Sequence, residues 1–337
     1  MAKYLVTGGA GFIGSHLVDL LLSRGHQVVV LDALSFGADT RNLPEGARIF
    51  GAIGRQRAGN LPEEQCLLVI GDVAESDLVL DLVSKTDACF HLAAQTHVDR
   101  SYGDVRPFVD SNVIGSYAVL EAFRKQPEKR LVYMSTDEVY GDKADGFSLE
   151  SDPVEPRNIY SALKASGDLL AQTYAAIYGI NLVIARPANN YGPRQLEEKL
   201  VPKIVNTLIR RMYQGFGGKI PVYGDGAQVR DWLYVKDTVE ALLALHDRGK
   251  AGQIYNVGRN EFRTVVEVIQ EISILMGTEW ADHVEYVADR IRGDRRYALN
   301  VHKAATELDW KSKVKFSNGL GETGSWYKWA YSTGARA

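Results

Sequence analysis

Cysteine is scarce in this sequence, and its scarcity argues against a cysteine-based metal site. The 337 residues contain two cysteines, Cys66 and Cys89, both in apolar segments. Their spacing is not that of metal ligands. We expect both to be small buried side chains in a reducing compartment, with no metal bound.

The sequence also lacks a large excess of either charge and lacks long apolar runs. Lysine and arginine number 39 against 42 aspartates and glutamates, a net charge of −3. This balance gives no electrostatic reason to expect nucleic acid or an anionic membrane as a partner. No uninterrupted apolar stretch is long enough to cross a bilayer, and "KYLVTGG" begins the first strand almost at Met1, so we expect no signal peptide. A soluble, cytoplasmic protein is the expectation.

What the chain does contain is enough apolar sequence for a large core. Apolar residues make up 45% and charged residues 24%, which are ordinary values for a globular protein. Strand-like runs alternate with helical patterns up to about residue 190, and beyond Tyr191 the pieces become shorter. The alternation predicts an α/β fold with a doubly wound parallel sheet.

A glycine-rich turn joins the first strand to the first helix within residues 4–32. The turn satisfies G-x-G-x-x-G at 9–14 and G-x-x-G-x-x-G at 8–14. The first glycines allow a tight turn and close approach of a pyrophosphate, while Gly14 lets the helix pack against the strand. The helix N-terminus then directs free N–H groups at the phosphates. The turn therefore predicts a dinucleotide-binding Rossmann unit.

The second strand ends at Asp32, and the next strand-like run ends at 71–73. An acid at the first position accepts hydrogen bonds from the adenosine ribose and repels a 2′-phosphate, which favours NAD over NADP. The alternative is that Asp32 only caps the following loop. Asp72 and Val73 are placed to bind the adenine edge.

Residues 33–66 show no clear period. The stretch 48–65 contains many glycines and three arginines, Arg48, Arg55 and Arg57. We expect an irregular excursion, either a solvated loop or a flexible segment near the adenosine end of the cofactor.

Two apolar runs in the middle of the chain end in small or polar residues. The run within 87–101 passes into Ala93 and Ala94, which would let a ligand lie close, and Asn112 is placed to hold this loop by hydrogen bonds to its backbone. The next run ends with two adjacent carboxylates, Asp137 and Glu138. Because the carboxyl ends of the strands line the ligand crevice in such a sheet, we favour a functional pair over a solvated loop.

A strongly helical run over 159–179 carries Tyr160 and Lys164, which share one face because they are four residues apart. An ammonium beside a phenol favours the phenolate, so we expect Lys164 to lower the pKa of Tyr160 toward that of a useful base. The alternative is an amphipathic surface pair.

Together these features resemble the extended short-chain dehydrogenase/reductases. Within them the chain is most similar to the nucleotide-sugar 4,6-dehydratases, and closest to those that act on dTDP-glucose. The resemblance runs from about residue 3 to 327, is weakest over 33–66, and is most specific at Thr136-Asp137-Glu138. It is carried by "TGGAGFIG", Asp32, "HLAAQTHVDRS", "STDEVYG", Tyr160 with Lys164, "NNYGPRQLEEKLVPK", "IPVYGDGAQVRDWLYVKD", "YNVG" and "DRIRGDRRYALN".

The resemblance implies a domain division, NAD as cofactor and a homodimer. Residues 1–190 would form the NAD-binding Rossmann domain, to which strands near 232–258 return, and 191–337 a smaller α/β domain that binds the nucleotide sugar. The dimer would pair helices around 110–124 and 160–178. The cofactor would be held by Gly8, Gly11, Phe12, Ile13, Gly14, Asp32, Asp72, Val73, Leu92, Ala93, Ala94, Asn112, Tyr160 and Lys164.

The resemblance also implies the roles of the catalytic residues. The sugar is oxidised at C4, with Tyr160 taking the hydroxyl proton, Lys164 supporting it and hydride passing to NAD. Glu138 then removes the C5 proton, Asp137 protonates the departing C6 hydroxyl, and hydride returns to C6. Thr136 would bond the C4 oxygen. One carboxyl must be charged and the other protonated, and mutual repulsion with partial burial can separate their pKa values in this way.

Substrate contacts follow from the same resemblance, with one departure from the family pattern. Arg230 is the natural partner of the diphosphate, and the alternative is a surface arginine paired with Asp225 or Asp231. The family usually reads Asp-Arg-Pro-Gly-His-Asp where this chain has 289–294, which leaves the identity of the base open. The expected contacts are Thr96, Thr136, Asn190, Lys199, Leu200, Pro221, Tyr223, Arg230, Asn260, Arg290 and Arg292.

The C-terminal third predicts further helices and core residues. Residues 200–214 and 263–277 look helical, and Thr264 with Glu267 has the spacing of a capping box. We expect core positions at Met276, Trp310, Trp326 and Trp329.

Several alternatives share the fold or the cofactor. A 4-epimerase usually has small residues at the positions of Asp137 and Glu138, a nucleotide-sugar decarboxylase has serine in place of Asp137, and a related dehydratase would take UDP-glucose. A non-catalytic NAD-binding redox sensor would need a broken catalytic set, whereas Thr136, Tyr160 and Lys164 are all present.

Overall fold

The computed structural model describes residues 1–52, 61–289 and 293–335. Its largest feature is an eight-stranded sheet in which every neighbouring pair is parallel, in the order β11-β7-β6-β5-β1-β2-β4-β3. The doubly wound sheet expected from the sequence is confirmed. Its strands are β1 (Lys3–Thr7), β2 (Gln27–Asp32), β3 (Arg48–Ala52), β4 (Cys66–Ile70), β5 (Ala88–His91), β6 (Arg130–Met134), β7 (Leu182–Pro187) and β11 (Ile254–Val257).

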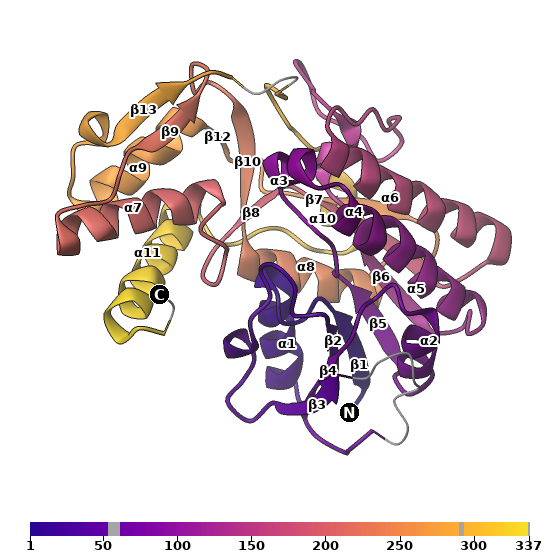
Figure 1. Ribbon diagram of the computed structural model, residues 1–337. Coiled ribbons are helices and arrows are strands. Elements are labelled where there is room, and N and C mark those ends of the chain that lie inside the picture. Colours follow the sequence, from indigo (N-terminus) through magenta and orange to yellow (C-terminus); the bar gives the residue numbers. More distant parts are fainter. Residues whose placement is uncertain (53–60, 290–292, 336–337) are drawn as a thin grey trace.

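Helices cover both faces of this sheet (Figure 1). Alternate residues of one strand point to opposite faces, so Tyr4 and Val6 of β1 pack in one apolar cluster and Leu5 packs in the other. The first layer includes α1 (Phe12–Ser23) and α8 (Val235–Arg248), and the second includes α2 (Ser76–Ser84), α5 (Gly115–Arg124) and α6 (Ile159–Tyr178). The remaining helical elements of this part of the chain are short: α3 (Val98–Gly103), α4 (Arg106–Val109), η2 (Asp110–Ile114), η3 (Asp137–Tyr140) and α10 (His302–Glu307).

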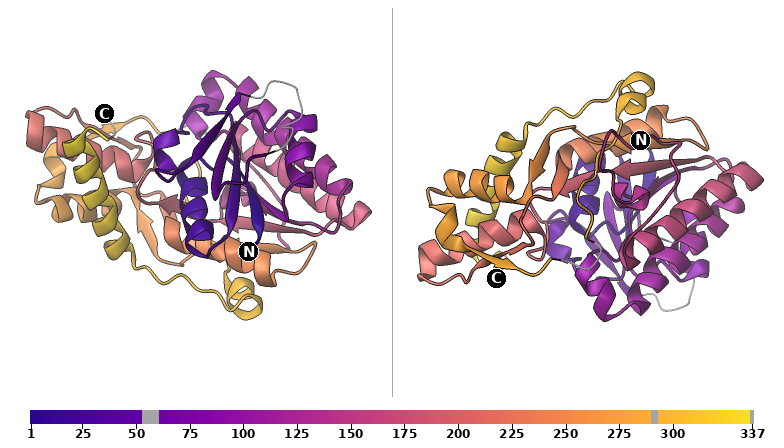
Figure 2. Two further views of the ribbon diagram at one scale, coloured as in Figure 1. Left: turned by 90° about the horizontal axis from the view of Figure 1, so that it is seen from below. Right: turned by 90° about the horizontal axis from the view of Figure 1, so that it is seen from above.

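A second, smaller unit lies to one side of the large sheet, and both views of Figure 2 show its helices away from α5 and α6. It contains a three-stranded sheet in the order β12-β10-β8 and a parallel pair of β9 and β13. One apolar cluster fills its interior. Its elements are β8 (Asn189–Tyr191), α7 (Leu200–Gln214), β9 (Ile220–Tyr223), β10 (Val229–Tyr234), β12 (Phe262–Thr264), α9 (Val265–Met276), η4 (Trp280–His283), β13 (Val284–Val287) and α11 (Phe316–Thr333).

The chain after residue 190 does return to the large sheet, although only in part. β11 pairs with β7 at the edge of that sheet, and α8 packs against it. β10 instead pairs with β8 and β12 in the smaller unit. The division of the chain at residue 190 stays a prediction.

Two local expectations are wrong. Part of the segment 33–66 is regular, because a 3-10 turn forms at η1 (Thr40–Asn42). β3 adds an edge strand to β4, with a register shift between Ile49 and Ala52. Arg55 and Arg57 lie outside the described residues. Trp329 is 53% exposed and not in the core, whereas Met276 and Trp310 are buried as expected. Trp326 is partly buried against the second unit's core.

Helix α9 begins with the capping box expected at Thr264 and Glu267. Within the described ranges, no helix has the length and apolar character needed to span a membrane. The same ranges hold no group of three or more side chains suited to bind a metal ion.

Candidate functional site

The glycine turn between β1 and α1 is built so that only glycine fits at its key positions. Gly8 has a φ of +72°, and a Cβ there would stand 2.8 Å from the Ala93 backbone. A Cβ on Gly14 would stand 2.1 Å from the Gly8 carbonyl oxygen, closer than any real contact. The turn therefore presents bare backbone at the start of α1, as a bound pyrophosphate requires.

A cavity of about 290 Å³ opens above this turn at the carboxyl ends of the strands. Every residue expected to hold the cofactor lines it except Asn112. Asn112 has the indirect role expected of it, because its amide accepts from the Gln95 backbone N–H at 2.8 Å and donates to the Gln95 carbonyl at 3.0 Å. We call this space the cofactor cavity.

Asp32 holds the loop after β2, which was the alternative role given to it, and it also lines the cofactor cavity. Its Oδ2 accepts a hydrogen bond from the Ala10 N–H and its Oδ1 accepts one from the Leu34 N–H, both at 2.9 Å. It thereby stabilises the turn after β2 while it lines the cofactor cavity. Burial raises the pKa of Asp32, and these two hydrogen bonds oppose the rise.

Residues 35–37 line the cofactor cavity, which agrees with the alternative that placed part of 33–66 near the cofactor, but their individual contacts were not predicted. Ser35 Oγ accepts a hydrogen bond from Gln95 Nε2 at 3.0 Å, and the Arg100 guanidinium lies 3.5 Å from the centre of the Phe36 ring. Gly37 packs against Leu196 so closely that a Cβ would stand 2.7 Å from that side chain. We call these contacts the 35–37 clasp. No local pattern marks them, because the partners come from distant loops.

Asp137 and Glu138 lie in the turn η3, which directly follows β6. Thr136 Oγ1 donates to Asp137 Oδ1 at 3.1 Å and accepts from the Glu138 N–H at 3.3 Å. Asp137 is 3% exposed, and its Oδ2 has no hydrogen-bond partner among the described residues. Burial, followed by the charge of Glu138, raises the pKa of Asp137 to about 8. The surroundings of Asp137 therefore favour its protonated form.

Glu138 has more compensating groups around it. Burial raises its pKa, but Asn158 Nδ2 donates to Oε2 at 3.3 Å, and the charges of Arg230 and Lys199 also favour the carboxylate. The two neighbouring carboxyls thus have different surroundings, as an acid and a base in one site require.

Tyr160 and Lys164 lie together at the start of α6, both lining the cofactor cavity. We expected a lowered pKa for the Tyr160 phenol, and this expectation is wrong. Burial, followed by Glu138 and Asp137, raises the pKa of Tyr160. Lys164 Nζ donates to the Met134 carbonyl at 2.7 Å, and burial lowers its own pKa to about 8. Burial and the two carboxyls therefore decide the direction of the shift in the pKa of Tyr160.

A second cavity of about 320 Å³ lies between the large sheet and the smaller unit. Six of the expected substrate contacts line it, namely Asn190, Lys199, Leu200, Pro221, Tyr223 and Arg230. Thr96 and Thr136 line the cofactor cavity instead. We call this space the substrate cavity. The two cavities share Glu138, Tyr160, Asn189, Asn190, Gln195 and Lys199, so the carboxylate and the phenol stand where they meet.

Arg230 faces the substrate cavity and not a surface carboxylate. Its guanidinium donates to the Val229 and Asp294 carbonyls and lies 4.3 Å from the centre of the Tyr297 ring. Asp225 pairs instead with Arg295. Arg230 is therefore held by backbone oxygens, and no carboxylate of the described residues forms an ion pair with it, which suits a diphosphate partner.

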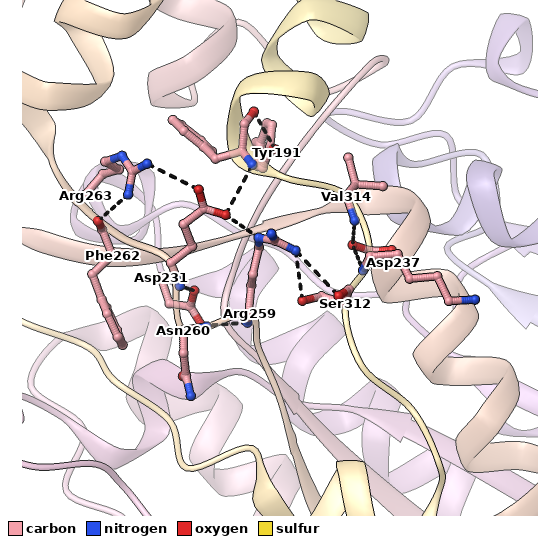
Figure 3. A network of polar contacts seen from close by, with 12 residues as sticks. Tyr191, Asp231, Asp237, Arg259, Asn260, Phe262, Arg263, Ser312 and Val314 are labelled. Atoms are coloured by element: carbon pink, nitrogen blue, oxygen red, sulfur yellow. Dashed lines mark hydrogen bonds and ion pairs between the residues drawn. The ribbon is translucent and has the colours of Figure 1, made fainter.

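Asn260 does not line either cavity. Its loop is held by Asp231, whose carboxylate accepts from the backbone N–H groups of Arg259, Asn260 and Glu261 at 2.9–3.0 Å. Figure 3 shows the Asn260 side chain directed away from the guanidinium groups of Arg259 and Arg263. Arg290 and Arg292 lie outside the described residues, while Asp289, Gly293 and Asp294 line the substrate cavity.

Several lining residues were not predicted. Asn158 was detectable, because Asn-x-x-Ser before a helical run signals a cap, and Asn158 does cap α6. Gln195 and Gln228 lie in segments that carry the family resemblance, but no role was assigned to them there.

Comparison with known proteins agrees with this arrangement. The sequence model of the NAD dependent epimerase/dehydratase family matches residues 4–258. The chain belongs to this family. A dTDP-glucose 4,6-dehydratase of Actinoplanes is 38% identical over 333 residues, covering 97% of this chain and 98% of that protein.

Solved structures of the family have the same fold with different activities. A dTDP-glucose 4,6-dehydratase from Streptomyces venezuelae, solved with NAD bound, is 36% identical with a TM-score of 0.87, and 98% of each chain is covered. A UDP-glucose 4-epimerase from Thermotoga maritima, solved with UDP-glucose, is 29% identical with a TM-score of 0.85, and 98% of this chain and 99% of that one are covered. The fold alone does not separate the two activities, so the site residues must.

Proposed function

We propose that the protein is an NAD-dependent nucleotide-sugar 4,6-dehydratase that converts dTDP-glucose to dTDP-4-keto-6-deoxyglucose. It is then a hydro-lyase. The observation that carries this proposal is the buried Asp137, whose pKa is raised by burial and by Glu138, at the place beside Glu138 where the cofactor and substrate cavities meet. An epimerase has no water to eliminate and needs no such acid. The 36–38% identity to dTDP-glucose dehydratases supports the same choice.

NAD fits the cofactor cavity. The bare backbone at Gly8 and Gly14 is a cradle that any Cβ would fill, and Asp32 lines the end suited to a ribose. The chemistry that NAD supplies when bound is removal of a hydride from C4 of the sugar and its return to C6.

Tyr160 and Thr136 act on the C4 oxygen in this proposal. Tyr160 takes the hydroxyl proton, and Thr136, which lines the same cavity, hydrogen-bonds the oxygen. Because burial, followed by Glu138 and Asp137, raises the pKa of Tyr160, proton acceptance needs a cation nearby, and Lys164 on the same helix face would supply it.

Glu138 and Asp137 carry out the elimination. A C4 ketone acidifies the C5 proton, which Glu138 removes as a carboxylate. Asp137 then delivers its proton to the departing C6 hydroxyl. The unpaired Oδ2 and the raised pKa of Asp137 both suit a proton donor.

The substrate cavity would hold the rest of the nucleotide sugar. Arg230 and Lys199 face the diphosphate, Asn190 the sugar, and Leu200, Pro221 and Tyr223 the nucleoside. The altered segment 289–294 leaves UDP-glucose as the alternative substrate. The cytoplasmic location stays a prediction.

We also propose a homodimer formed through α5 and α6. Large apolar side chains are exposed on these helices and the preceding turn, namely Ile114, Tyr117, Leu169, Ile177 and Tyr178. Contact with a second copy would remove this surface from water.

The test is incubation of the purified protein with dTDP-glucose and, in parallel, with UDP-glucose. We expect dTDP-glucose to lose the mass of one water. Unchanged mass with every nucleotide sugar tried would refute the dehydratase assignment, and water loss from UDP-glucose alone would move the substrate to the alternative.

A further inference from the structure

A fully buried carboxylate lies one helical turn beyond Lys164 on α6, and the proposed reaction does not use it. Tyr160, Lys164 and Asp168 follow each other at intervals of four residues, so they share one face of the helix. Asp168 is 0% exposed. A carboxylate in such a place is costly unless its oxygens are paired.

Its partner is Arg186, on strand β7. Arg186 Nε donates to Asp168 Oδ2 at 2.9 Å and Nη2 donates to Oδ1 at 2.7 Å, a two-point contact between groups that are 1% and 0% exposed. Gln172 Nε2 adds a hydrogen bond to Oδ1 at 2.7 Å. Burial alone would lower the pKa of Arg186, but the hydrogen bonds and charge of Asp168 outweigh it and raise that pKa.

Arg186 also contacts the turn that carries the two catalytic carboxyls. Its guanidinium lies 4.7 Å from the centre of the Tyr140 ring, a cation–π distance. Tyr140 is the last residue of η3, whose first two residues are Asp137 and Glu138. The Tyr140 hydroxyl donates to Asn256 Oδ1 on β11 at 2.8 Å, which fixes the ring from its other end.

The pair therefore stands between the two halves of the reaction centre. One half is α6, with Tyr160 and Lys164, and the other is η3, with the acid and the base. Asp168 also acts on Lys164 by charge, because it opposes the lowering of the lysine pKa that burial causes. Strand β7 continues from Arg186 into Pro187, which lines the cofactor cavity.

We propose that Asp168 and Arg186 are a positioning pair that fixes α6 relative to the η3 turn, so that the C4 proton acceptor and the elimination carboxyls act on one bound sugar. The inference rests on the proposed function. Neither residue lines the cofactor or the substrate cavity, so neither is a catalytic residue.

A gain in stability alone does not explain why a buried ion pair, and not an apolar pair, occupies these two positions. A buried ion pair contributes little more than well-packed apolar residues of the same volume, and often less, because both charges lose their hydration. What an apolar pair would not supply is the fixed two-point geometry of a guanidinium on a carboxylate.

The experiment compares Asp168→Asn with the double variant Asp168→Asn, Arg186→Gln. The single variant leaves a buried arginine unpaired and should unfold more easily. The double variant removes both charges and should recover much of that loss. In both, KM for dTDP-glucose should stay near the wild-type value while kcat, measured per folded and NAD-loaded enzyme, falls about tenfold to a hundredfold, because small misplacements of reacting groups cost rates of this size.

The pH profile provides a second readout that a purely structural role would not move. Without the Asp168 carboxylate, the Lys164 ammonium should lose its proton at lower pH, so the alkaline limb of kcat in Asp168→Asn should shift to lower pH. Asp81→Asn, which breaks the Asp81–Lys85 ion pair next to α2, serves as the control and should leave both kcat and the profile unchanged.

The outcomes separate the two proposals. Absence of turnover in the wild-type protein would count against the dehydratase assignment. Wild-type turnover with an undiminished kcat in the folded double variant would overturn the positioning role of the pair. A raised KM with an unchanged kcat would overturn it as well.

Discussion

The Oδ2 atom of Asp137 is buried without a hydrogen-bond partner among the described residues, while Glu138, one residue further, accepts from Asn158 and faces two cations. Unpaired buried oxygens favour a bound proton, and nearby donors and cations favour a charge. The local surroundings therefore support the proposal that Asp137 is the acid and Glu138 the base.

Variants of the two carboxyls should fail at different steps. In Asp137→Asn, C4 oxidation should persist, seen as nicotinamide reduction on addition of dTDP-glucose, while elimination slows about a hundredfold or more, as loss of a general acid does. In Glu138→Gln, exchange of the C5 proton with solvent deuterium should fall by a similar factor. Equal loss of every step in both variants would indicate a structural pair.

The raised pKa of Asp137 also predicts a pH-dependent cost in stability. The folded state keeps a proton up to pH about 8, whereas the ordinary value is 3.8. Between these values the unfolded chain binds fewer protons, so this group lowers the free energy of unfolding as pH rises, and below pH about 4 it has no effect.

Asp137→Asn removes this titration. Relative to the wild-type protein, the variant should gain roughly 1 kcal/mol of unfolding free energy per pH unit between pH 5 and pH 8, the direction set by one raised carboxyl pKa. Urea unfolding of both proteins at several pH values measures the difference. Parallel stability curves would show that Asp137 does not carry a raised pKa.

At the scale of single elements, the glycine turn allows the sharpest prediction. Gly14→Ala places a Cβ 2.1 Å from the Gly8 carbonyl oxygen, so the turn must open and its N–H groups must move. We expect the affinity for NAD to fall at least about tenfold, the equivalent of one or two lost hydrogen bonds to a charged group. A fluorescence titration with NAD measures it on folded protein.

Gly321→Ala is the matched control for that variant. Gly321 lies inside α11 with no atom within 4 Å of an added Cβ, and alanine favours a helix over glycine. Its NAD affinity should equal that of the wild-type protein. Equal affinity in Gly14→Ala as well would contradict the role assigned to the turn.

The elements that could be predicted from the sequence are those with strong local signals. Residues 200–214 match α7 to the residue, and the Tyr160 helix was predicted within one residue, because apolar spacing and caps mark both. β3 was missed because it is an edge strand with an exposed Ile49, a register shift and a glycine at 51. Its pairing is decided by β4 and not by its own pattern.

The site was predictable where a motif carries chemistry and not where distant loops meet. The glycine turn, the carboxyl pair and the Tyr160–Lys164 spacing are local signals. The Asp168–Arg186 contact, the 35–37 clasp and the lining residue Gln228 depend on tertiary packing. The pKa of Tyr160 was predicted in the wrong direction, because the sequence shows the nearby lysine but not the depth of burial.

At the scale of the whole molecule, the exposed apolar face of α5 and α6 predicts the dimer. Ile177 is 67% exposed on α6, and Ile177→Glu should place a charge in the interface and give a monomer. Ile274→Glu is the control, because Ile274 is 78% exposed on α9 and should tolerate the change. Sedimentation at micromolar concentration distinguishes the species, and a monomeric wild-type protein would end the proposal.

The 35–37 clasp has a consequence for how such an enzyme works in a cell. The hydride removed in the first half of the reaction is given back in the second, so the nicotinamide ends each cycle as it began. Phe36 lines the cofactor cavity and is held by its contact with Arg100, so we expect the cofactor to stay bound between cycles. We expect the protein to keep one NAD molecule bound through many turnovers without exchanging it with free NAD. The rate of deoxysugar formation would then follow the sugar supply and be independent of the cell's balance of oxidised and reduced nicotinamide.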